Sequence, residues 1–327
     1  LGTKLKMIDH ADAVAAMNRK YGNLYVEDVI PKDMYRGMDT DNKQATVMNI
    51  LVAHSNMDDK TAYNIVKTIF DRRDDLTFKI SAGDQHYVLR TKPGPAAKLL
   101  PSAHAIEREY RVMKALAGTD VPVPQMYCLC EDESVIGRAF YVMEFVSGRV
   151  LWDQSLPGMD PSGRRAIYLE MNRVMAALHT VDVKAAGLAD YGKPGNYFER
   201  QIGRWSKQYQ ASADGAGPLT QPIPEMEQLI AWLPAHIPAM ARREDMVSVV
   251  HGDYRLDNLM FHPTEPRVLA VLDWELSTLG HPLADFSYHC MAWHIPPGEF
   301  RGMGGVDLAA LGIPDEAAYV QRYCQRT

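Results

Sequence analysis

The sequence predicts an α+β fold in which a small β-rich part is followed by a large helical part. Residues 76–145 contain short apolar runs separated by glycine and proline turns. Residues 146–327 carry apolar side chains at helical spacing over several stretches. Inside this helical part, residues 247–275 form three short apolar runs that lead into polar side chains. The length of 327 residues allows two domains or one large two-lobed domain, and residues 1–75 are expected to form an additional N-terminal α/β segment.

The composition is that of an ordinary globular protein, with 46% hydrophobic and 23% charged residues. The formal net charge of −6 favours neither nucleic acid nor an anionic membrane as a partner. No apolar run approaches the roughly 18 residues of a membrane span, and no signal peptide is expected after Leu1. Four cysteines are few for a disulfide framework, so we expect a reducing compartment, the cytoplasm.

The N-terminal segment has its own pattern of elements. We expect a strand at Val26–Ile30, a polar turn region at Tyr35–Lys43, a strand at Ala45–Ala53, and a helix from Asn56 to about Asp71. The stretch IPKDMYRGMDTDNKQATVMNILVAHSNMDDKTAYNIVKTIFDRRDDL resembles the C-terminal part of TAXI-type solute-binding proteins of TRAP transporters. A divergent extension of the domain that follows is the alternative.

The β-rich part predicts a small sheet and one helix. We expect a hairpin formed by Leu76–Ile80 and His86–Arg90, followed by a helix at His104–Leu116. Two further strands are expected, one within residues 121–133 and one at residues 139–145. Cys128 and Cys130 alternate along the third of these strands. Their spacing without a second ligand pair is weak evidence for a metal, so we expect them to pack in the core.

The helical part begins where Asp160 caps a helix and Pro161 takes its first position. Apolar stripes predict two helices that face the core, at Ile167, Met171, Val174, Met175 and Leu178 and at Phe198, Ile202, Trp205 and Tyr209. Residues 226–232 are expected to begin the next helix. Pro282 opens a helix that carries Asp285, and a last helix includes AAYVQRYCQRT. Because acidic residues at metal-ligand spacing are missing, we expect structural roles for His281, His289 and His294.

Residues 247–275 carry the most specific pattern in the chain. We expect a short strand at Val247–Val250, followed by a hairpin whose two strands are Leu259–Phe261 and Val268–Leu272. Asp253, Asn258 and Asp273 would then lie at the ends of adjacent strands. Phosphoryl transfer needs a carboxylate near the attacking hydroxyl and hard oxygen ligands for Mg²⁺, and these three residues supply both. Ordinary hairpin turns, in which Asp and Asn are common, are the alternative.

The pattern H-G-D-x-x-x-x-N, followed by an apolar strand that ends in D-W-E, resembles the catalytic and metal loops of the aminoglycoside phosphotransferase and choline kinase families. These families share the two-lobed protein-kinase-like fold. The resemblance implies an ATP- and Mg²⁺-dependent kinase with Asp253 as catalytic base. It places His251 and Arg255 in the same catalytic loop, and it makes Asn258 and Asp273 the Mg²⁺ ligands.

The same resemblance assigns residues outside this loop. Arg90 takes the position of the strand residue that contacts nucleotide phosphates, with Glu109 as its expected helical partner and Glu107 as the rival. Asp285 would brace the catalytic loop by hydrogen bonds. The hinge between the lobes, where the backbone meets the adenine, would be Met143, Glu144 and Phe145. A solvated basic strand end and exposed acidic side chains are the alternatives for Arg90, Glu109 and Asp285.

Three longer motifs refine the resemblance. KLLPSAHAIEREYRV, PGNYFERQI and VLDWELSTLGHPLADF look most like kinase-like domains that are fused to, or found beside, acyl-CoA dehydrogenases. This implies a hydroxylated acyl group, free or on coenzyme A, as the phosphate acceptor, and an acyl-CoA dehydrogenase as a partner. The chain ends within an apparent helix, whereas the C-lobe of the family usually continues.

One departure from the family concerns the phosphate loop. In place of a glycine-rich loop the chain has Asp71-Arg72-Arg73-Asp74-Asp75, which suggests that two unrelated fragments join near residue 75. Three acids repel a triphosphate, and glycine geometry is missing, so we expect weak ATP·Mg binding. Calorimetry should show tighter binding after residues 1–75 are replaced by a glycine- and serine-containing kinase N-terminus. Equal, tight affinity would contradict this.

Two alternative functions remain for the chain: a non-catalytic kinase-like binding module and a transporter-associated ligand-binding fragment.

Overall fold

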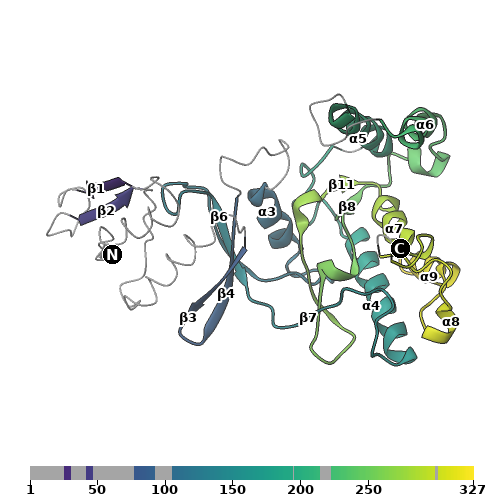
Figure 1. The fold of residues 1–327 in the computed structure, drawn as a ribbon, viewed down its shortest axis with the longest axis horizontal. Coiled ribbons are helices and arrows are strands. Elements are labelled where there is room, and N and C mark those ends of the chain that lie inside the picture. Colours follow the sequence, from purple (N-terminus) through teal and green to yellow (C-terminus); the bar gives the residue numbers. More distant parts are fainter. Residues whose placement is uncertain are drawn as a thin grey trace. The chain divides into compact units, whose positions relative to one another are not determined.

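The computed structural model divides the chain into two compact units (Figure 1). Unit 1 comprises residues 1–110 and 125–145, and unit 2 comprises residues 111–124 and 146–327. The structure describes residues 26–30, 42–46, 77–92, 105–193, 195–213, 222–298 and 301–327. The acidic stretch 71–75 lies outside these residues.

Unit 1 contains a four-stranded antiparallel sheet in the order β3-β4-β6-β5. Its strands are β3 (Thr77–Ala82), β4 (Gln85–Thr91), β5 (Met126–Cys130) and β6 (Phe140–Glu144). The predicted hairpin is confirmed, and Gly83 takes a φ of 60° in its two-residue turn. Phe78, Leu89 and Ile136 form a buried cluster against the sheet. One face of the small sheet therefore has a core of its own.

The N-terminal strands agree only partly with the prediction. Strand β1 (Val26–Ile30) has the predicted bounds, and it pairs antiparallel with β2 (Asn42–Thr46). The strand predicted at Ala45–Ala53 begins earlier, at Asn42, because polar residues that were predicted to form a turn pair with β1. Residues 47–53 and the helix predicted from Asn56 lie outside the described residues.

Helix α3 (Ile106–Leu116) corresponds to the helix predicted from residue 104, which itself lies outside the described residues. Strand β5 is an edge strand with an irregularity between Met126 and Cys128. Cys128 is consequently exposed, and the expectation that it packs in the core was wrong. Cys130 is partly buried, and all four cysteines of the chain are free thiols.

Unit 2 holds two small antiparallel sheets. One has the order β10-β9-β7, formed by β7 (Arg149–Val150), β9 (Leu259–Phe261) and β10 (Val268–Val271). The other pairs β8 (Ser248–Val250) with β11 (Thr278–Gly280). The three predicted strands exist, but the first is not paired with the hairpin. Its partner β11 is too short for an alternating pattern of apolar and polar residues to predict it.

The predicted helices of unit 2 are present, and one short helix, α8, was not predicted. They are α4 (Pro161–His179), α5 (Tyr197–Ala213), α6 (Pro224–Trp232), α7 (Leu283–Cys290), α8 (Leu308–Leu311) and α9 (Glu316–Cys324). Asp160 caps α4 by accepting a hydrogen bond from the Gly163 amide at 2.9 Å. The predicted apolar stripe of α4 is buried along its whole length, where the helix packs on β8 and α9. Helix α4 therefore forms the centre of the unit 2 core.

Helices α5 and α6 behave differently. Trp205 on α5 is 49% exposed, and α6 buries no residue in the structure. The expectation that the α5 stripe faces the core was therefore wrong at Trp205. An amphipathic pattern predicts a helix face, but it does not specify what covers that face.

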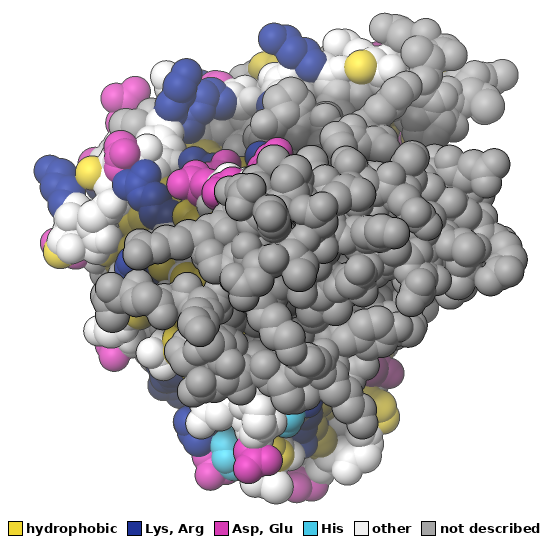
Figure 2. Space-filling model, turned by 90° about the vertical axis from the view of Figure 1, so that its left-hand side faces the viewer, with side chains coloured by type: hydrophobic (Ala, Val, Ile, Leu, Met, Phe, Trp, Pro, Cys, Tyr) yellow, Lys and Arg dark blue, Asp and Glu magenta, His cyan; other side chains and the backbone are white. Residues whose placement is uncertain are grey.

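The described surface is mixed in charge. Figure 2 shows one face, on which the coloured side chains intermix Lys and Arg with Asp and Glu. This agrees with 35 basic and 41 acidic residues in the sequence. Among the described helices, none combines the length and the apolar character that crossing a bilayer requires.

Candidate active site

The turn after β8 is held by one buried carboxylate. Asp285, only 1% exposed on α7, accepts the backbone amide of His251 at 2.6 Å and that of Gly252 at 2.7 Å. His179 Nε2 lies 3.3 Å from the same carboxylate. Gly252 has a φ of 86°, and a Cβ there would lie 2.9 Å from the Leu276 carbonyl oxygen. The backbone of this turn is thus fixed by charge-assisted hydrogen bonds and by a glycine-only conformation.

The His251 ring joins the turn to strand β10. Its Nε2 lies 2.8 Å from the Leu272 carbonyl oxygen, which can only accept, so Nε2 carries the proton. Its Nδ1 accepts the Asp253 amide at 3.2 Å. Both ring nitrogens are therefore used within the protein, and the neutral tautomer is fixed. The geometry gives His251 a positioning role for the backbone of Asp253.

The Asp253 carboxylate lies at the centre of a small polar cluster. Its Oδ1 accepts the Tyr288 hydroxyl at 2.9 Å, and its Oδ2 lies 3.1 Å from Asn258 Nδ2 and 2.8 Å from Arg255 Nη2. Burial, together with the hydrogen bond to Asp253, raises the pKa of Tyr288 to about 12. Tyr288 therefore remains a donor at neutral pH. These contacts orient a carboxylate whose side chain is 18% exposed.

Asn258 and Asp273 present oxygen atoms at the ends of the hairpin strands. Asn258 Nδ2 donates to the Asp253 carbonyl oxygen at 2.8 Å, so its Oδ1 is the amide atom suited to a cation. The Leu272 amide donates to the Asn258 carbonyl oxygen at 2.9 Å, which brings the two segments together. Asp273 adopts the left-handed conformation, with φ 66° and ψ 58°. Such a conformation is uncommon for a residue other than glycine and is found at functional sites.

The donor set suits Mg²⁺. This ion prefers oxygen ligands, and it often takes one or two carboxylates together with substrate phosphates and water. Among the described residues there is no group of three or more His, Cys, Asp or Glu side chains that could hold a metal alone. Asn258 and Asp273 supply the amide and carboxylate oxygens that such an ion prefers.

Unit 1 contains a buried ion pair. Arg90 Nε lies 2.7 Å from Glu109 Oε2, and the Glu109 side chain is 2% exposed. The Tyr141 hydroxyl donates to the same Glu109 oxygen at 3.0 Å. The predicted pairing of Arg90 with Glu109 is confirmed. Contact of Arg90 with a nucleotide stays a prediction.

The three predicted hinge residues lie at and just after the end of β6 in unit 1. Met143 is 9% exposed within β6. The Glu144 amide donates to the Gln125 carbonyl oxygen at 2.8 Å, and the Glu144 carboxylate accepts the Gln125 amide at 3.1 Å. The Lys79 ammonium lies 4.2 Å from the centre of the Phe145 ring. These contacts fix the end of β6, and adenine recognition by this segment stays a prediction.

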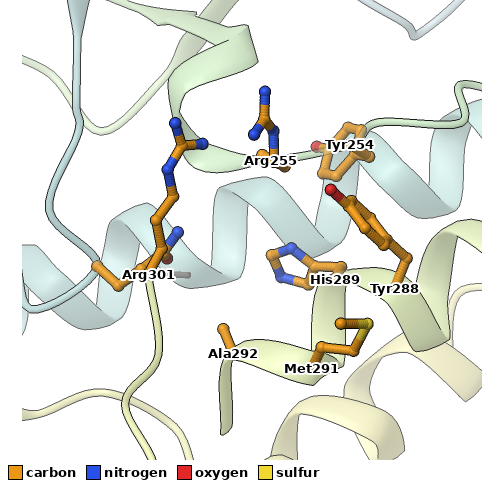
Figure 3. Close-up of a pocket in the computed structure, with 8 residues that line it drawn as sticks. Tyr254, Arg255, Tyr288, His289, Met291, Ala292 and Arg301 are labelled. Carbon is orange, nitrogen blue, oxygen red and sulfur yellow. The ribbon is translucent and has the colours of Figure 1, made fainter. Parts of the chain in front are cut away.

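Sequence reasoning named Arg255 but missed Tyr288 and Arg301, which line the same pocket in unit 2 (Figure 3). Tyr288 follows Asp285 by three positions on α7, so helical spacing could have identified it. Arg301 forms an ion pair with Asp257, 44 residues away, and no local pattern signals that contact. The pocket is lined by Gln154, Tyr254, Arg255, Tyr288, His289, Met291, Ala292 and Arg301.

Comparison with known proteins places this geometry in a family. Residues 66–319 match the phosphotransferase enzyme family, and residues 2–90 match the NMT1-like family. A Ralstonia eutropha protein named as a candidate aminoglycoside phosphotransferase is 69% identical, with a TM-score of 0.69 over 77% of this chain and 71% of that one. A gentamicin complex of APH(2")-IIa shares only the fold, with 15% identity and a TM-score of 0.52 over 83% and 86% of the two chains.

Longer relatives align with part of their length. Mouse acyl-CoA dehydrogenase family member 10 is 50% identical over 76% of this chain and 22% of its own length. Human acyl-CoA dehydrogenase family member 11 is 43% identical over 76% of this chain and 30% of its own length. The chain thus spans between a fifth and a third of these relatives. With most of its sequence matched and its α+β structure in agreement, the chain belongs to the phosphotransferase enzyme family, in its kinase-like fold, and is related to the kinase-like part of these acyl-CoA dehydrogenase family members.

Proposed function

We propose that the chain transfers the γ-phosphoryl group of ATP to a hydroxyl group of a small molecule. The observation that carries this proposal is the cluster at Asp253. A partly exposed carboxylate is oriented by Tyr288, Arg255 and Asn258, on a turn that Asp285 anchors. Asp253 then accepts the proton of the attacking hydroxyl, as the base in phosphoryl transfer does.

The other residues named by the family resemblance would have separate roles in this proposed reaction. Asn258 and Asp273 would hold Mg²⁺, which neutralises charge on the phosphates when it is bound. Arg90, fixed by Glu109, would contact those phosphates, and Met143, Glu144 and Phe145 would meet the adenine. His251 acts through the backbone of Asp253. The proposed division of the chain is an N-terminal segment at residues 1–75, an N-lobe at residues 76–145 and a C-lobe at residues 146–327.

The acceptor is proposed from the relatives. They are acyl-CoA dehydrogenase family members, so a hydroxylated acyl group, free or on coenzyme A, is the proposed substrate. An acyl-CoA dehydrogenase is the proposed partner, and the free cysteines suit the proposed cytoplasmic location. The direct test is ³¹P NMR of the chain with Mg·ATP and a hydroxy acid or its coenzyme A ester. Formation of ADP together with a phosphate monoester supports the proposal. ATP that stays intact both with this chain and with the version whose residues 1–75 are replaced by a glycine- and serine-containing kinase N-terminus contradicts it.

The metal assignment gives a separate prediction. Replacing Asp273 by Asn removes one negative charge from the Mg²⁺ ligands while the side-chain size stays the same. We expect the Mg²⁺ concentration for half-maximal activity to rise by roughly 10- to 100-fold, the range for weakened metal sites. A matched control is Glu265→Gln on the same hairpin, whose side chain is 55% exposed. A wild-type Mg²⁺ titration of Asp273→Asn would contradict the assignment.

A further inference from the structure

Helix α9 is docked on α4, the central helix of unit 2. Asn172 on α4 donates from Nδ2 to the Tyr319 carbonyl oxygen at 3.0 Å, and Arg326 Nη1 donates to Asn172 Oδ1 at 3.1 Å. An isolated helix of nine residues is marginal in water, so α9 depends on this packing. Tyr319 and Tyr323 on α9 are consequently buried.

A buried network of three side chains, Tyr323, His179 and Asp285, joins α9 to the turn after β8. The Tyr323 hydroxyl lies 2.6 Å from His179 Nδ1, and His179 Nε2 lies 3.3 Å from Asp285 Oδ2. The side chains of His179 and Asp285 are each 1% exposed. The Tyr323 ring also stacks on Phe286, with the ring centres 4.1 Å apart. Because water hardly reaches the His179 ring, its hydrogen bonds depend on Tyr323 and Asp285.

The Tyr323 hydroxyl fixes the orientation of the His179 ring. Burial raises the pKa of Tyr323, so the hydroxyl keeps its proton at neutral pH. It can donate to Nδ1 of a neutral ring and accept from Nδ1 of a protonated ring, so it suits both forms. In either form Nε2 carries a proton, because the ionised carboxylate of Asp285 can only accept. The ring is thereby held with its Nε2–H directed at Asp285.

The network ends one residue before the proposed base. Asp285 accepts the amides of His251 and Gly252, and Asp253 is the next residue. If the Tyr323 hydroxyl is removed, the imidazole loses the partner of its Nδ1 and no longer has a fixed orientation. Asp285 then loses a donor that orients its carboxylate and stabilises its charge, so its two hydrogen bonds to the turn become weaker.

We propose that Tyr323 is a positioning residue of the site, through which helix α9 holds the turn that carries the proposed base. This inference rests on the proposed function and deepens it, because it makes the docking of α9 a condition for full activity. Tyr323 acts through His179 and Asp285 and does not touch the substrate. His179 and Tyr323 lie 144 positions apart, so this coupling exists only in the folded unit.

The first test measures backbone hydrogen exchange in the whole chain. Tyr323→Phe removes only the hydroxyl and should speed exchange at the amides of His251 and Gly252 by about 3- to 10-fold, the range for the loss of one hydrogen bond. The matched control is Tyr319→Phe on the same helix, because this buried hydroxyl has no hydrogen-bond partner among the described residues. The control should leave exchange at the turn unchanged. An equal rise throughout unit 2, or no rise at the turn, overturns the inference.

A second variant tests whether the effect passes through His179. In His179→Gln, the side-chain amide can donate to Asp285 without help from the Tyr323 hydroxyl. Adding Tyr323→Phe to this variant should therefore change exchange at the turn no further, which makes the two substitutions non-additive. Additive effects of the two substitutions overturn the inference.

Steady-state kinetics relate the network to catalysis. The kcat of Tyr323→Phe should fall by about 3- to 10-fold while the KM for ATP stays the same, because the turn carries the proposed base and not the proposed nucleotide contacts. Tyr319→Phe should keep the wild-type kcat. If the wild type transfers phosphate and Tyr323→Phe keeps its kcat, the inference is overturned. If exchange at the turn changes as expected but neither this chain nor its version with a replaced N-terminus transfers phosphate, the proposed kinase function fails and the positioning role stands.

Discussion

Replacing Asp253 by Asn is expected to lower kcat by about 10²–10⁴, the range for the loss of a positioned general base. The amide has the shape of the carboxylate but cannot take up the proton of the acceptor hydroxyl. The nucleotide is proposed to bind through other residues, so the KM for ATP should change little. Steady-state kinetics of ADP release, with a saturating acceptor, measure both constants.

A matched control tests whether the effect belongs to the site. Asp245→Asn makes the same chemical change in unit 2 at a side chain that is 66% exposed, and it should retain wild-type kcat. If Asp253→Asn keeps its activity within about threefold, Asp253 is not the base. The Tyr288 hydroxyl would then need a different explanation, since its hydrogen bond to Asp253 would serve structure alone.

The largest effect on stability is expected for Asp285→Ala. The side chain is fully buried, and it accepts hydrogen bonds from the amides of His251 and Gly252 as well as facing His179. Removing one partner of a buried charged network typically costs about 3–5 kcal/mol. Urea denaturation should show this loss in the free energy of unfolding. Asp285→Asn keeps one acceptor oxygen, so it should lose less, and an unchanged unfolding midpoint for Asp285→Ala would contradict the bracing role.

The same residue sets a pH dependence. Burial alone would raise the pKa of Asp285, but the hydrogen bond and charge of His179, with the hydrogen bond from the His251 backbone amide, hold it below the usual value. A carboxyl with a lowered pKa stabilises the folded state fully above the unfolded value of about 3.9, and this contribution is lost as the pH falls through the folded pKa. The stability gap between wild type and Asp285→Asn should therefore narrow below about pH 4.

The sequence best predicted the positions of residues that depend on their immediate neighbours in the chain. Asp253, Asn258 and Asp273 were placed correctly relative to short strands, because turn residues follow apolar runs within a few positions. The buried face of α4 was also predictable, since its apolar residues repeat along a long helix. The Arg90–Glu109 pair was found only through the family resemblance, because these residues are 19 positions apart.

Other features depend on contacts that periodicity does not encode. The pairing of β8 with β11 involves three residues on each strand, which is too short for an alternating pattern. The Arg301–Asp257 pair, and the His289 Nε2 atom that has no hydrogen-bond partner among the described residues, arise only when α7 and Arg301 meet the turn after β8. Long-range meetings of this kind are set by the whole fold, and the pocket could not be predicted without them.

The peptide of Leu272 has a consequence for how this site can change during evolution. Its carbonyl oxygen is bonded to the His251 ring, and its amide is bonded to the Asn258 backbone. Because only main-chain atoms of Leu272 take part, its side chain can drift without uncoupling the proposed base from the proposed metal ligands. The conformational entropy that this arrangement costs is lost during folding, before any substrate binds. Selection can therefore change the side chains around this turn while the spacing of the proposed reactive groups is inherited unchanged.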